Sequence, residues 1–369
     1  SNLRGNGAAP VELLALDRAA VFTAPDITRK QPITPKGNAI PWNKYSQTSV
    51  YCSMLKRWVA RNLMLGREQG DAFPSGEHLY VPPQNTATDS YYFFIRSDSG
   101  ATLVSRLACR QNMECEFWLG IHLPNQSPWI WEGISTQLNT PFPSIEGLAF
   151  MPNSDLSWTI NIDLPQFNLK GSLRFTPTTE ILDFAKLRDK NQIASALAKM
   201  PWNAASFKAL KSMKTEHIEQ AGTWNGELTW NENVHSMLGV GARDHSRGER
   251  NWKHWNAHCW FTGFDSEGAG FNLSLIDFKG LPTLRAGYIS IHKNEAVPLK
   301  DGPDSPIKLA SGEFQLSGGH LNGPVNFKTQ NSFEFTMDGS YRIVEGFGSF
   351  YWQGKQYEGI LERGYSLNP

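Results

Sequence analysis

Ionisable side chains crowd into one short run, residues 239–252, which reads Gly-Val-Gly-Ala-Arg-Asp-His-Ser-Arg-Gly-Glu-Arg-Asn-Trp. Glycines, which allow tight turns, bracket this run. A carboxylate beside an arginine stays ionised, whereas one in an apolar pocket has a raised pKa and can donate a proton. We therefore predict that Asp244 and His245 are catalytic residues and that Arg243 and Arg250 bind substrate.

A second motif, His217-Ile-Glu219, lies shortly upstream. If this segment is a strand, its two polar side chains point the same way because they are two residues apart. A histidine beside a carboxylate can carry protons in catalysis, so both residues join the predicted catalytic set. Trp224, Trp252 and Trp255 lie in or beside the motifs and are predicted to form apolar walls of the substrate site; the alternative for each is core packing.

The charges of the 239–252 run restrict where it can lie. Buried charges must pair, and a run anchored by tryptophans cannot be wholly exposed. A domain junction beside a cavity meets both conditions. We expect Asp244 there, held by Arg243 or Arg250, with His217 and His245 nearby. The alternative is an Arg–Asp network that only ties two β-domains together.

Short strands separated by turn residues dominate the chain after about residue 88. The segment 91–96 is aromatic and β-branched, residues 97–100 are typical of a turn, and residues 103–107 begin another strand. Such repetition is typical of antiparallel barrels and sandwiches. The sequence predicts an all-β protein whose two antiparallel barrel or sandwich domains, residues 78–222 and 223–369, pack side by side.

Two stretches depart from the strand pattern. Residues 1–77 are predicted to form an extension with one amphipathic helix over about 49–65. That helix either docks on the β-body, as most do, or lies on a membrane surface as a peripheral contact. Residues from about 179 to 214 are predicted to form a helical insertion, which is a lid, a dimer contact or a plain connector.

Bulk composition excludes several classes of protein. Lys+Arg and Asp+Glu are both 35, so the net charge is +0 and we expect no nucleic-acid partner. Walker A, dinucleotide-binding and nucleophile-elbow motifs are absent from the sequence. Because neither a long apolar run nor a signal peptide is visible, we expect a cytoplasmic protein, with membrane association through the 49–65 helix as the open alternative. The sequence does not indicate an oligomeric state.

The cysteines and histidines do not form a recognised metal or redox motif. Cys109 and Cys115 could face each other across a hairpin, but a reduced chain is the simpler interpretation. His245, His254 and His258 lie close in sequence without the helical spacing of a zinc site. We therefore expect no metal and no cofactor.

The two motifs resemble those of a family of two-domain, lipocalin-like proteins. In that family they read His-Tyr-Glu-Gln-x-Gly and Gly-x-Arg-Asp-His-Ser-Trp-Gly-x-Arg-Asp-Trp; here they read His217-Ile-Glu-Gln-Ala-Gly and Gly239-x-Gly-x-Arg-Asp-His-Ser-x-Gly-x-Arg-x-Trp252. The wider group includes carotenoid 1,2-hydratases (hydroxyneurosporene synthases) and resembles tocopherol cyclases and fungal Diels–Alderases. The likeness covers about residues 78–369, with Arg247 in place of the usual Trp and Asn251 in place of the usual Asp.

The resemblance implies a cleft between two lipocalin-like domains, near the 243–250 charges. It also implies an enzyme that cyclises, hydrates or isomerises a hydrophobic small molecule of terpenoid, polyene or polyketide type. The alternative is a carrier that binds a lipid or terpenoid without chemistry. The Arg-Asp-His cluster favours the enzyme, and the lack of an unmistakable catalytic pair favours the carrier.

Overall fold

The computed structural model describes residues 44–64, 82, 87–204, 206–207, 215–249, 251–293, 295–306, 312–337 and 339–367. Their strands form two antiparallel sheets, and the predicted all-β, lipocalin-like fold is confirmed. Aromatic and β-branched residues fill these strands, which is the composition that packs well on a pleated surface.

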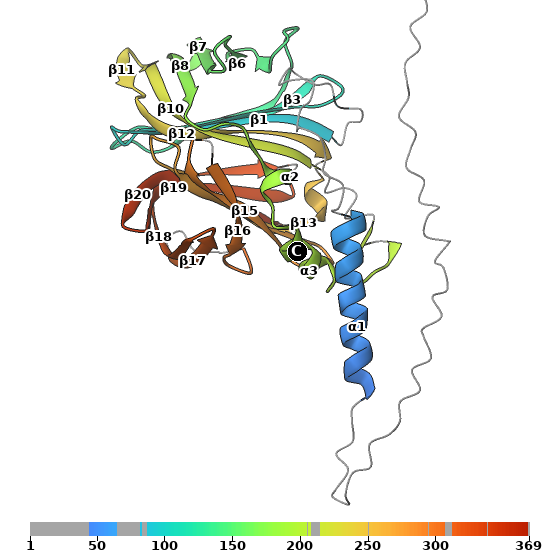
Figure 1. The fold of residues 1–369 in the computed structure, drawn as a ribbon. Helices are drawn as coiled ribbons and strands as arrows, with labels where there is room; N and C mark the ends of the chain where they lie inside the picture. Colours follow the sequence, from blue (N-terminus) through green and yellow to red (C-terminus); the bar gives the residue numbers. More distant parts are fainter. Residues whose placement is uncertain are drawn as a thin grey trace, which may run out of the picture. The chain divides into compact units, whose positions relative to one another are not determined.

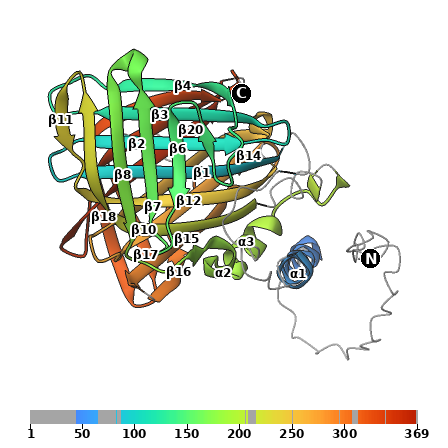
Figure 2. The ribbon, with the colours of Figure 1, turned by 90° about the horizontal axis from the view of Figure 1, so that it is seen from above.

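The first sheet has twelve strands in the order β4-β3-β2-β1-β12-β10-β8-β7-β6-β5, with β9 and β11 paired to β10. In Figures 1 and 2, β6–β8 cross over β1–β3, so the sheet folds over itself. A first core, which includes Phe93, Phe150 and Trp224, fills the space between the two halves. The strands are β1 (Ala87–Ser97), β2 (Thr102–Cys109), β3 (Glu114–His122), β4 (Trp129–Thr136), β5 (Ser144–Ile145), β6 (Leu148–Pro152), β7 (Trp158–Leu164), β8 (Leu169–Pro177), β9 (Leu182–Asp183), β10 (Thr215–Trp230), β11 (Asn233–Ser236) and β12 (Gly239–Glu249).

The second sheet is a closed barrel of eight strands, β13 to β20. Closure pairs every strand on both sides, so the barrel has no free edge. Its interior is a separate core rich in phenylalanine, including Phe261, Phe271 and Phe350. The strands are β13 (Trp255–Phe264), β14 (Gly270–Phe278), β15 (Leu284–His292), β16 (Glu295–Asp301), β17 (Gly312–Gly318), β18 (Leu321–Met337), β19 (Tyr341–Trp352) and β20 (Lys355–Ser366).

A third core joins the two sheets, and we call this region the junction. Tyr92, Phe94 and Trp118 of the first sheet pack there with Phe335 and Phe347 of the barrel. The rings of Trp118 and Phe335 stack with centroids 4.6 Å apart. Figure 1 shows the barrel strands β15, β19 and β20 below β1 and β12 of the first sheet. The junction is therefore the outer face of the barrel against one face of the first sheet.

The chain passes from the first sheet to the barrel after the predicted domain boundary between residues 222 and 223. Strand β10 runs unbroken through that point, and β12 still belongs to the first sheet. The first sheet ends at Glu249 and the barrel begins at Trp255. The reason is that β10 and β12 insert between β8 and β1 instead of starting a new sheet.

The predicted extension helix is present as α1 (Lys44–Val59) followed by a π-helical turn (Ala60–Met64). Ala60 packs with residues of α3 (Lys190–Leu197), and the Lys56 ammonium lies 5.6 Å from the Trp202 ring centroid. Met54, Leu55 and Trp58 are instead more than half exposed. The helix therefore docks through one face while the other presents apolar side chains. The rest of the predicted extension, residues 1–43 and 65–77, lies outside the described residues.

The predicted helical insertion contains α2 (Phe184–Leu187) and α3. Asp183 and Asp189 cap them, because each side chain accepts backbone N–H groups of the first helical turn. Most of residues 205–214 lies outside the described residues. Two short 3₁₀ turns, Pro165–Phe167 and Trp252–His254, lie elsewhere in the described chain.

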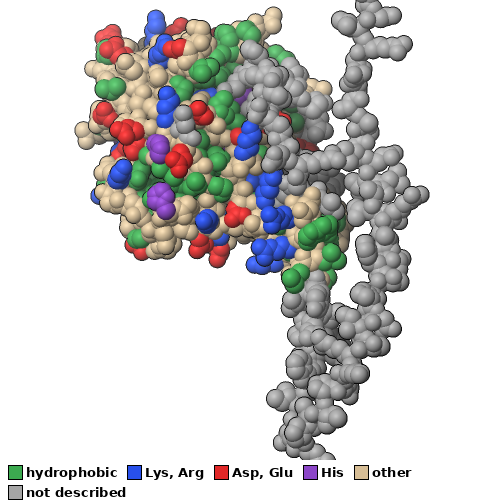
Figure 3. All heavy atoms as spheres, viewed as in Figure 1, with side chains coloured by type: hydrophobic (Ala, Val, Ile, Leu, Met, Phe, Trp, Pro, Cys, Tyr) green, Lys and Arg blue, Asp and Glu red, His purple; other side chains and the backbone are tan. Residues whose placement is uncertain are grey.

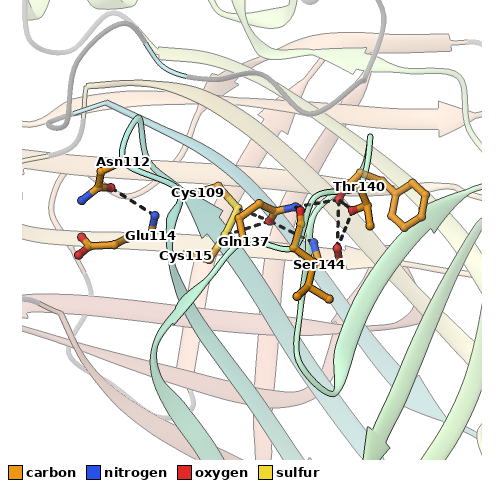
Figure 4. Close-up of a disulfide and its surroundings, with 9 residues drawn as sticks. Cys109, Asn112, Glu114, Cys115, Gln137, Thr140 and Ser144 are labelled. Carbon is orange, nitrogen blue, oxygen red and sulfur yellow. Dashed lines mark hydrogen bonds between the residues drawn. A yellow bond between two sulfur atoms is a disulfide. The ribbon is translucent and has the colours of Figure 1, made fainter.

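Cys109 and Cys115 form a disulfide, so the expectation of a reduced chain is wrong. The two residues are register partners on β2 and β3, and their Cα atoms are 4.1 Å apart. Figure 4 shows the Gln137 side chain between this disulfide and the loop that carries Thr140 and Ser144. The Gln137 carboxamide oxygen lies 3.2 and 3.3 Å from the two sulfurs, and its nitrogen donates to the carbonyl oxygens of residues 138 and 142.

The surface carries both signs of charge. On the face seen in Figure 3, acidic and basic side chains are interspersed, in keeping with the net charge of +0. In the part of the chain that the structure describes, no helix combines the length and apolar character needed to cross a membrane.

Candidate functional site

Alternation along β12 divides the charged run between the two faces of the first sheet. Asp244 is the register partner of Glu219 on β10 and of Tyr92 on β1, and these residues face the junction. Arg243 and His245 point the opposite way, into the first core. The Arg243 guanidinium lies 5.2 Å from the Trp158 ring centroid, and the His245 ring stacks on Tyr91 at 3.8 Å.

The structure therefore does not bring the predicted residues together as one group. Arg243 donates to the Gln220 carboxamide oxygen at 2.8 Å on the first-core face, so it does not share a face with Asp244. His245 is likewise separated from His217. Arg250 lies outside the described residues, and its contact with Asp244 stays a prediction.

His245 belongs to a buried cluster with Asp89 and Arg247 instead. The Asp89 carboxylate oxygen lies 2.7 Å from His245 Nε2 and 2.9 Å from Arg247 Nε. Asp89 and His245 have no exposed side-chain surface. Arg247, the residue that departs from the resembling family's motif, thus pairs a buried carboxylate. This arrangement meets the requirement that buried charges be paired, and it ties β1 to β12.

His217, Glu219 and Asp244 meet at the junction, and we call them the junction triad. His217 Nε2 lies 2.8 Å from Glu219 Oε1 and 2.9 Å from Asp244 Oδ2. The side chain of Glu219 is 1% exposed, that of Asp244 11% and that of His217 21%. The histidine and Asp244 are therefore the members that a bound molecule can reach, while Glu219 lies behind them.

The Glu219 carboxylate connects the first sheet to the barrel. It accepts hydrogen bonds from Trp260 Nε1 at 3.0 Å and from Asn272 Nδ2 at 2.8 and 2.9 Å. The Tyr288 hydroxyl donates to Glu219 Oε2. These donors come from β13, β14 and β15, so the barrel fixes the carboxylate that in turn orients His217. Burial and the nearby Glu219 carboxylate raise the pKa of Tyr288, which keeps its hydroxyl protonated as a donor.

The pKa of His217 reflects opposing effects. Burial lowers it, but Asp244 and then Glu219, each hydrogen-bonded and negatively charged, raise it more. The balance raises the pKa of His217 to about 10. The side chain is therefore an imidazolium at neutral pH, held between two carboxylates.

The same three side chains are the candidate metal ligands that the described residues offer, since their nitrogen and oxygen atoms lie within 4.8 Å of one another. The hydrogen bonds at Glu219 argue against that use. A carboxylate has about four lone-pair positions. Trp260, Asn272 and Tyr288 already fill those of Glu219, so the donor set fits a metal poorly and fits a shared proton well.

Helix α2 packs against one side of His217. The Phe184 ring packs against the His217 ring with centroids 4.8 Å apart, and it also meets Tyr288. A cavity of about 430 Å³ lies elsewhere, lined by Leu123, Gln126, Trp230 and neighbouring residues at the far end of β10 from His217. The apolar pocket expected at the junction therefore stays a prediction.

The three predicted tryptophans lie in different places. Trp252 packs in the junction core with Trp255 beside it, and the Trp252 ring stacks on Tyr341 at 5.0 Å. Trp224 lies on the opposite face of the first sheet, fully buried in the first core. The first two can line a junction site, whereas Trp224 cannot, because the sheet separates it from the triad.

Two glycines of the motif, Gly239 and Gly241, serve packing instead of a turn. Gly241 lies within β12 and does not have a positive φ. A Cβ atom there would come within 2.0 Å of the Phe94 carbonyl oxygen and 2.7 Å of the Trp224 indole nitrogen. The position is therefore glycine because the neighbouring strand and Trp224 occupy the space of a side chain.

Several functional candidates escaped the sequence analysis because they lie on distant strands. Asn272 lies between Phe271 and Leu273, and Glu345 follows the apolar pair 343–344, a pattern that would have indicated buried polar sites. Trp260, Tyr288 and Tyr92 carry no such distinction in the sequence.

Residues 75–300 match the family described as Domain of unknown function (DUF7064). The chain belongs to this family. The match includes the first sheet, both motifs and the first half of the barrel. No curated protein matches the chain.

Solved structures share this DUF7064 fold at low sequence identity. A protein assigned as AttH from Nitrosomonas europaea has a TM-score of 0.57 and 9% identity, covering 80% of this chain and 99% of its own. Kievitone hydratase from Nectria haematococca has a TM-score of 0.51 and 12% identity, covering 81% and 96%. CghA with Sch210972 has a TM-score of 0.50 and 10% identity, covering 80% and 96%. The fold-level resemblance predicted from the motifs is thereby confirmed.

Proposed function

We propose that this DUF7064 protein is an enzyme that cyclises, hydrates or isomerises a hydrophobic small molecule of terpenoid, polyene or polyketide type. One observation carries the proposal: His217 lies between two carboxylates at the margin of an apolar junction. Groups of opposite role held within proton-transfer distance, in surroundings that exclude water, are what general acid–base catalysis requires.

Each member of the triad has a distinct proposed role. His217, protonated at neutral pH, donates its Nε2 proton. Asp244, 2.9 Å from the same nitrogen, accepts a proton from water or from a carbon and returns it to His217. Glu219 is a positioning residue, because its side chain is 1% exposed and fully engaged with barrel donors.

The proposed reactions differ only in how the substrate completes its bonding. In a hydration, one carbon of a double bond gains the His217 proton, water adds to the other carbon, and the proton lost by water goes to Asp244. In an isomerisation, Asp244 instead removes a proton from a neighbouring carbon, whose bonding pair becomes the new double bond. In a cyclisation, a second double bond supplies the electron pair for a carbon–carbon bond before that proton loss. Each of the three reactions moves only protons and electron pairs, with no net oxidation.

Two of the structural relatives agree with small-molecule chemistry in this fold. One is a hydratase by name, and another was crystallised with the small molecule Sch210972. The proposed pocket is the junction near Trp252 and Trp255, which line the same core as the triad's barrel partners.

The carrier hypothesis keeps support from Glu219. A carboxylate that accepts from three barrel residues also ties the two sheets together, which would be useful in a protein that only binds. The two hypotheses differ in what happens to the ligand. Extraction of the native protein, followed by mass spectrometry, identifies what co-purifies. Incubation with that molecule and with related polyenes then reports conversion or recovery unchanged.

The decisive variant is Asp244→Asn, which keeps the side-chain shape and removes the proton acceptor. We expect turnover to fall by at least about 100-fold while ligand affinity stays within a few-fold. The matched control is His245→Gln, one residue away on the opposite face. That control should lower the melting temperature, because it breaks the buried pair with Asp89, but leave turnover per folded molecule unchanged. Unchanged turnover in Asp244→Asn would exclude the proposed role.

A further inference from the structure

Glu345 is a buried carboxyl group that makes no hydrogen bond of ordinary geometry with any described residue. It lies on β19 with no exposed surface, and neither of its oxygens has a partner among the described residues. The hydroxyl of Tyr92, a residue that is 5% exposed, also has none. Buried polar groups are nearly always paired, so two such groups side by side in one core require an explanation.

Strand register makes this pair continuous with the junction triad. On the first sheet, Tyr92 is the register partner of Asp244. On the barrel, Glu345 pairs with Glu362, which pairs with Trp260. Trp260 closes the connection between the sheets: its indole donates to Glu219, and its ring packs edge-on against Tyr92 at 5.4 Å. The unpartnered oxygens therefore belong to the same junction as His217.

The charged groups around Glu345 come from both sheets. Glu362 is adjacent on β20, and Arg106 and Asp244 act on the Glu345–Tyr92 pair from the first sheet. Burial is the largest influence on Glu345 and raises its pKa well above the usual range, and Glu362 raises it further. Burial and Glu345 likewise raise the pKa of Tyr92. Burial therefore favours the neutral O–H form of both groups. Tyr92 faces Glu345 and Glu345 faces Glu362, but among the described residues neither Tyr92 nor Glu345 has a side-chain contact that meets hydrogen-bond geometry.

The acidity of His217 supplies a second, chemical reason to expect a partner for these donors. Of the double bonds that the proposed function allows, an isolated one is the hardest to protonate for an imidazolium whose pKa is about 10. A double bond conjugated to a carbonyl is different, because the carbonyl oxygen accepts the electron pair as the reaction proceeds. A phenol and a neutral carboxylic acid in an apolar site together stabilise such an oxygen.

We propose that Tyr92 and Glu345 bind the carbonyl oxygen of the substrate, which makes that substrate an apolar α,β-unsaturated carbonyl compound. The inference rests on the proposed function and specifies its substrate class. In a hydration, water adds to the β-carbon and gives its proton to Asp244, while the π electrons move onto the oxygen held by Tyr92 and Glu345. His217 then protonates the α-carbon of this enolate, the carbonyl re-forms, and the proton on Asp244 restores His217. Tyr92 and Asp244 are register partners on strands whose backbones lie about 4.8 Å apart, so one conjugated carbonyl compound can contact both side chains.

The binding test uses β-ionone, a terpenoid enone, and the hydrocarbon of the same skeleton that lacks the oxygen. We expect the full chain to bind the enone at least about tenfold more tightly and to shift its carbonyl stretching band to lower frequency. Tyr92→Phe and Glu345→Gln should each lose most of that preference and of the shift. The matched control is Glu358→Gln on β20, a junction carboxylate already paired with Arg96 at 3.1 Å, which should retain both. Equal binding of the two probes, binding of neither, or a preference that survives in both variants would overturn the proposal.

A second measurement needs no ligand. A carboxyl group whose folded pKa is raised contributes stability below its unfolded pKa and loses it as the pH rises. Glu345→Gln removes this pH-dependent loss of stability. The melting temperature of Glu345→Gln, relative to that of the wild type, should therefore rise between about pH 4 and pH 8. The relative melting temperature of Glu358→Gln should stay constant over the same range. A constant difference across this range would show that Glu345 is not held neutral and would overturn the proposal.

The two proposals fail separately. Enone preference without turnover in any assay would leave the carbonyl site standing and remove the enzyme. Turnover that depends on Asp244 but not on Tyr92 or Glu345 would leave the enzyme standing and remove the carbonyl site.

Discussion

His217 illustrates how a single residue can be charged by its neighbours against the effect of burial. Two carboxylates outweigh desolvation and raise its pKa to about 10. A histidine whose pKa is raised on folding contributes stability that is complete below its unfolded pKa of about 6.5 and is lost as the pH rises through about 10. The wild type should therefore lose more thermal stability than His217→Gln between these two pH values.

Melting curves of both proteins across this range test the charge state of His217. His254→Gln is the control, because that histidine is exposed and its removal should leave the pH dependence unchanged. Parallel curves for wild type and His217→Gln would mean that His217 is neutral in the folded protein, and the proton-donor role would then be untenable.

At the same scale, the sequence located part of the candidate site. The i, i+2 spacing of His217 and Glu219 on one strand face was sufficient to place them together. The same alternation, applied to residues 243–245, separates Asp244 from Arg243 and His245, and the charge-based grouping overlooked it. Trp260, Asn272 and Tyr288 could not be found, because nothing local shows which strands of the barrel face Glu219.

Among the elements, the β2–β3 hairpin depends on a covalent link that spacing alone left open. Register places Cys109 directly opposite Cys115, a relation that follows once the turn between the strands is known. The bridge closes a loop with a sequence separation of 6. A loop of that length should contribute about 2 kcal/mol by restricting the unfolded chain.

We predict that the double variant Cys109→Ser/Cys115→Ser loses about 2 kcal/mol of unfolding free energy and that a reductant lowers wild-type stability to the same level. Urea denaturation with and without reductant measures both. Cys52→Ser is the control, since Cys52 is a free, exposed cysteine. Equal stability of oxidised and reduced wild type would contradict the bridge.

Because disulfides are rare in reducing compartments, the bridge also weighs against the cytoplasmic location expected from the sequence.

Element types were more predictable than element partners. Strand composition and turns indicated the β-class and the helices near residues 49–65 and 184–197. The boundary between the sheets was not predictable in this way, since β10 and β12 have the same alternation whether they pair with β1 and β8 or begin a new sheet. The predicted extension helix remains divided between the two predictions. Ala60, in the π-helical turn after α1, docks, while Met54, Leu55 and Trp58 of α1 stay exposed, as a peripheral membrane contact would require.

For the whole molecule, the junction makes the stability of each sheet depend on the other. Glu219 of the first sheet takes its donors from three barrel strands, and the junction core draws its residues from both sheets. If the sheets separated, Glu219 would lose these partners and Tyr92, Phe94 and Trp118 would lose their apolar cover. Separation therefore costs both apolar burial and a paired charge, and we expect the two sheets to unfold together.

Hydrogen exchange read by mass spectrometry across a urea series tests this expectation strand by strand. Protection in β7 and β8 of the first sheet and in β17 and β18 of the barrel should disappear at one midpoint. Asn272→Ala, which removes a donor from Glu219, should lower that midpoint for both sheets by an amount equivalent to about 1–3 kcal/mol. Asn326→Ala, at an exposed position of β18, should leave it unchanged. Two outcomes would mean that the junction does not couple the sheets: loss of protection in the barrel at lower urea than in the first sheet, or an Asn272→Ala effect confined to the barrel. A catalytic site built across the junction would then lack the rigid support that acid–base geometry needs.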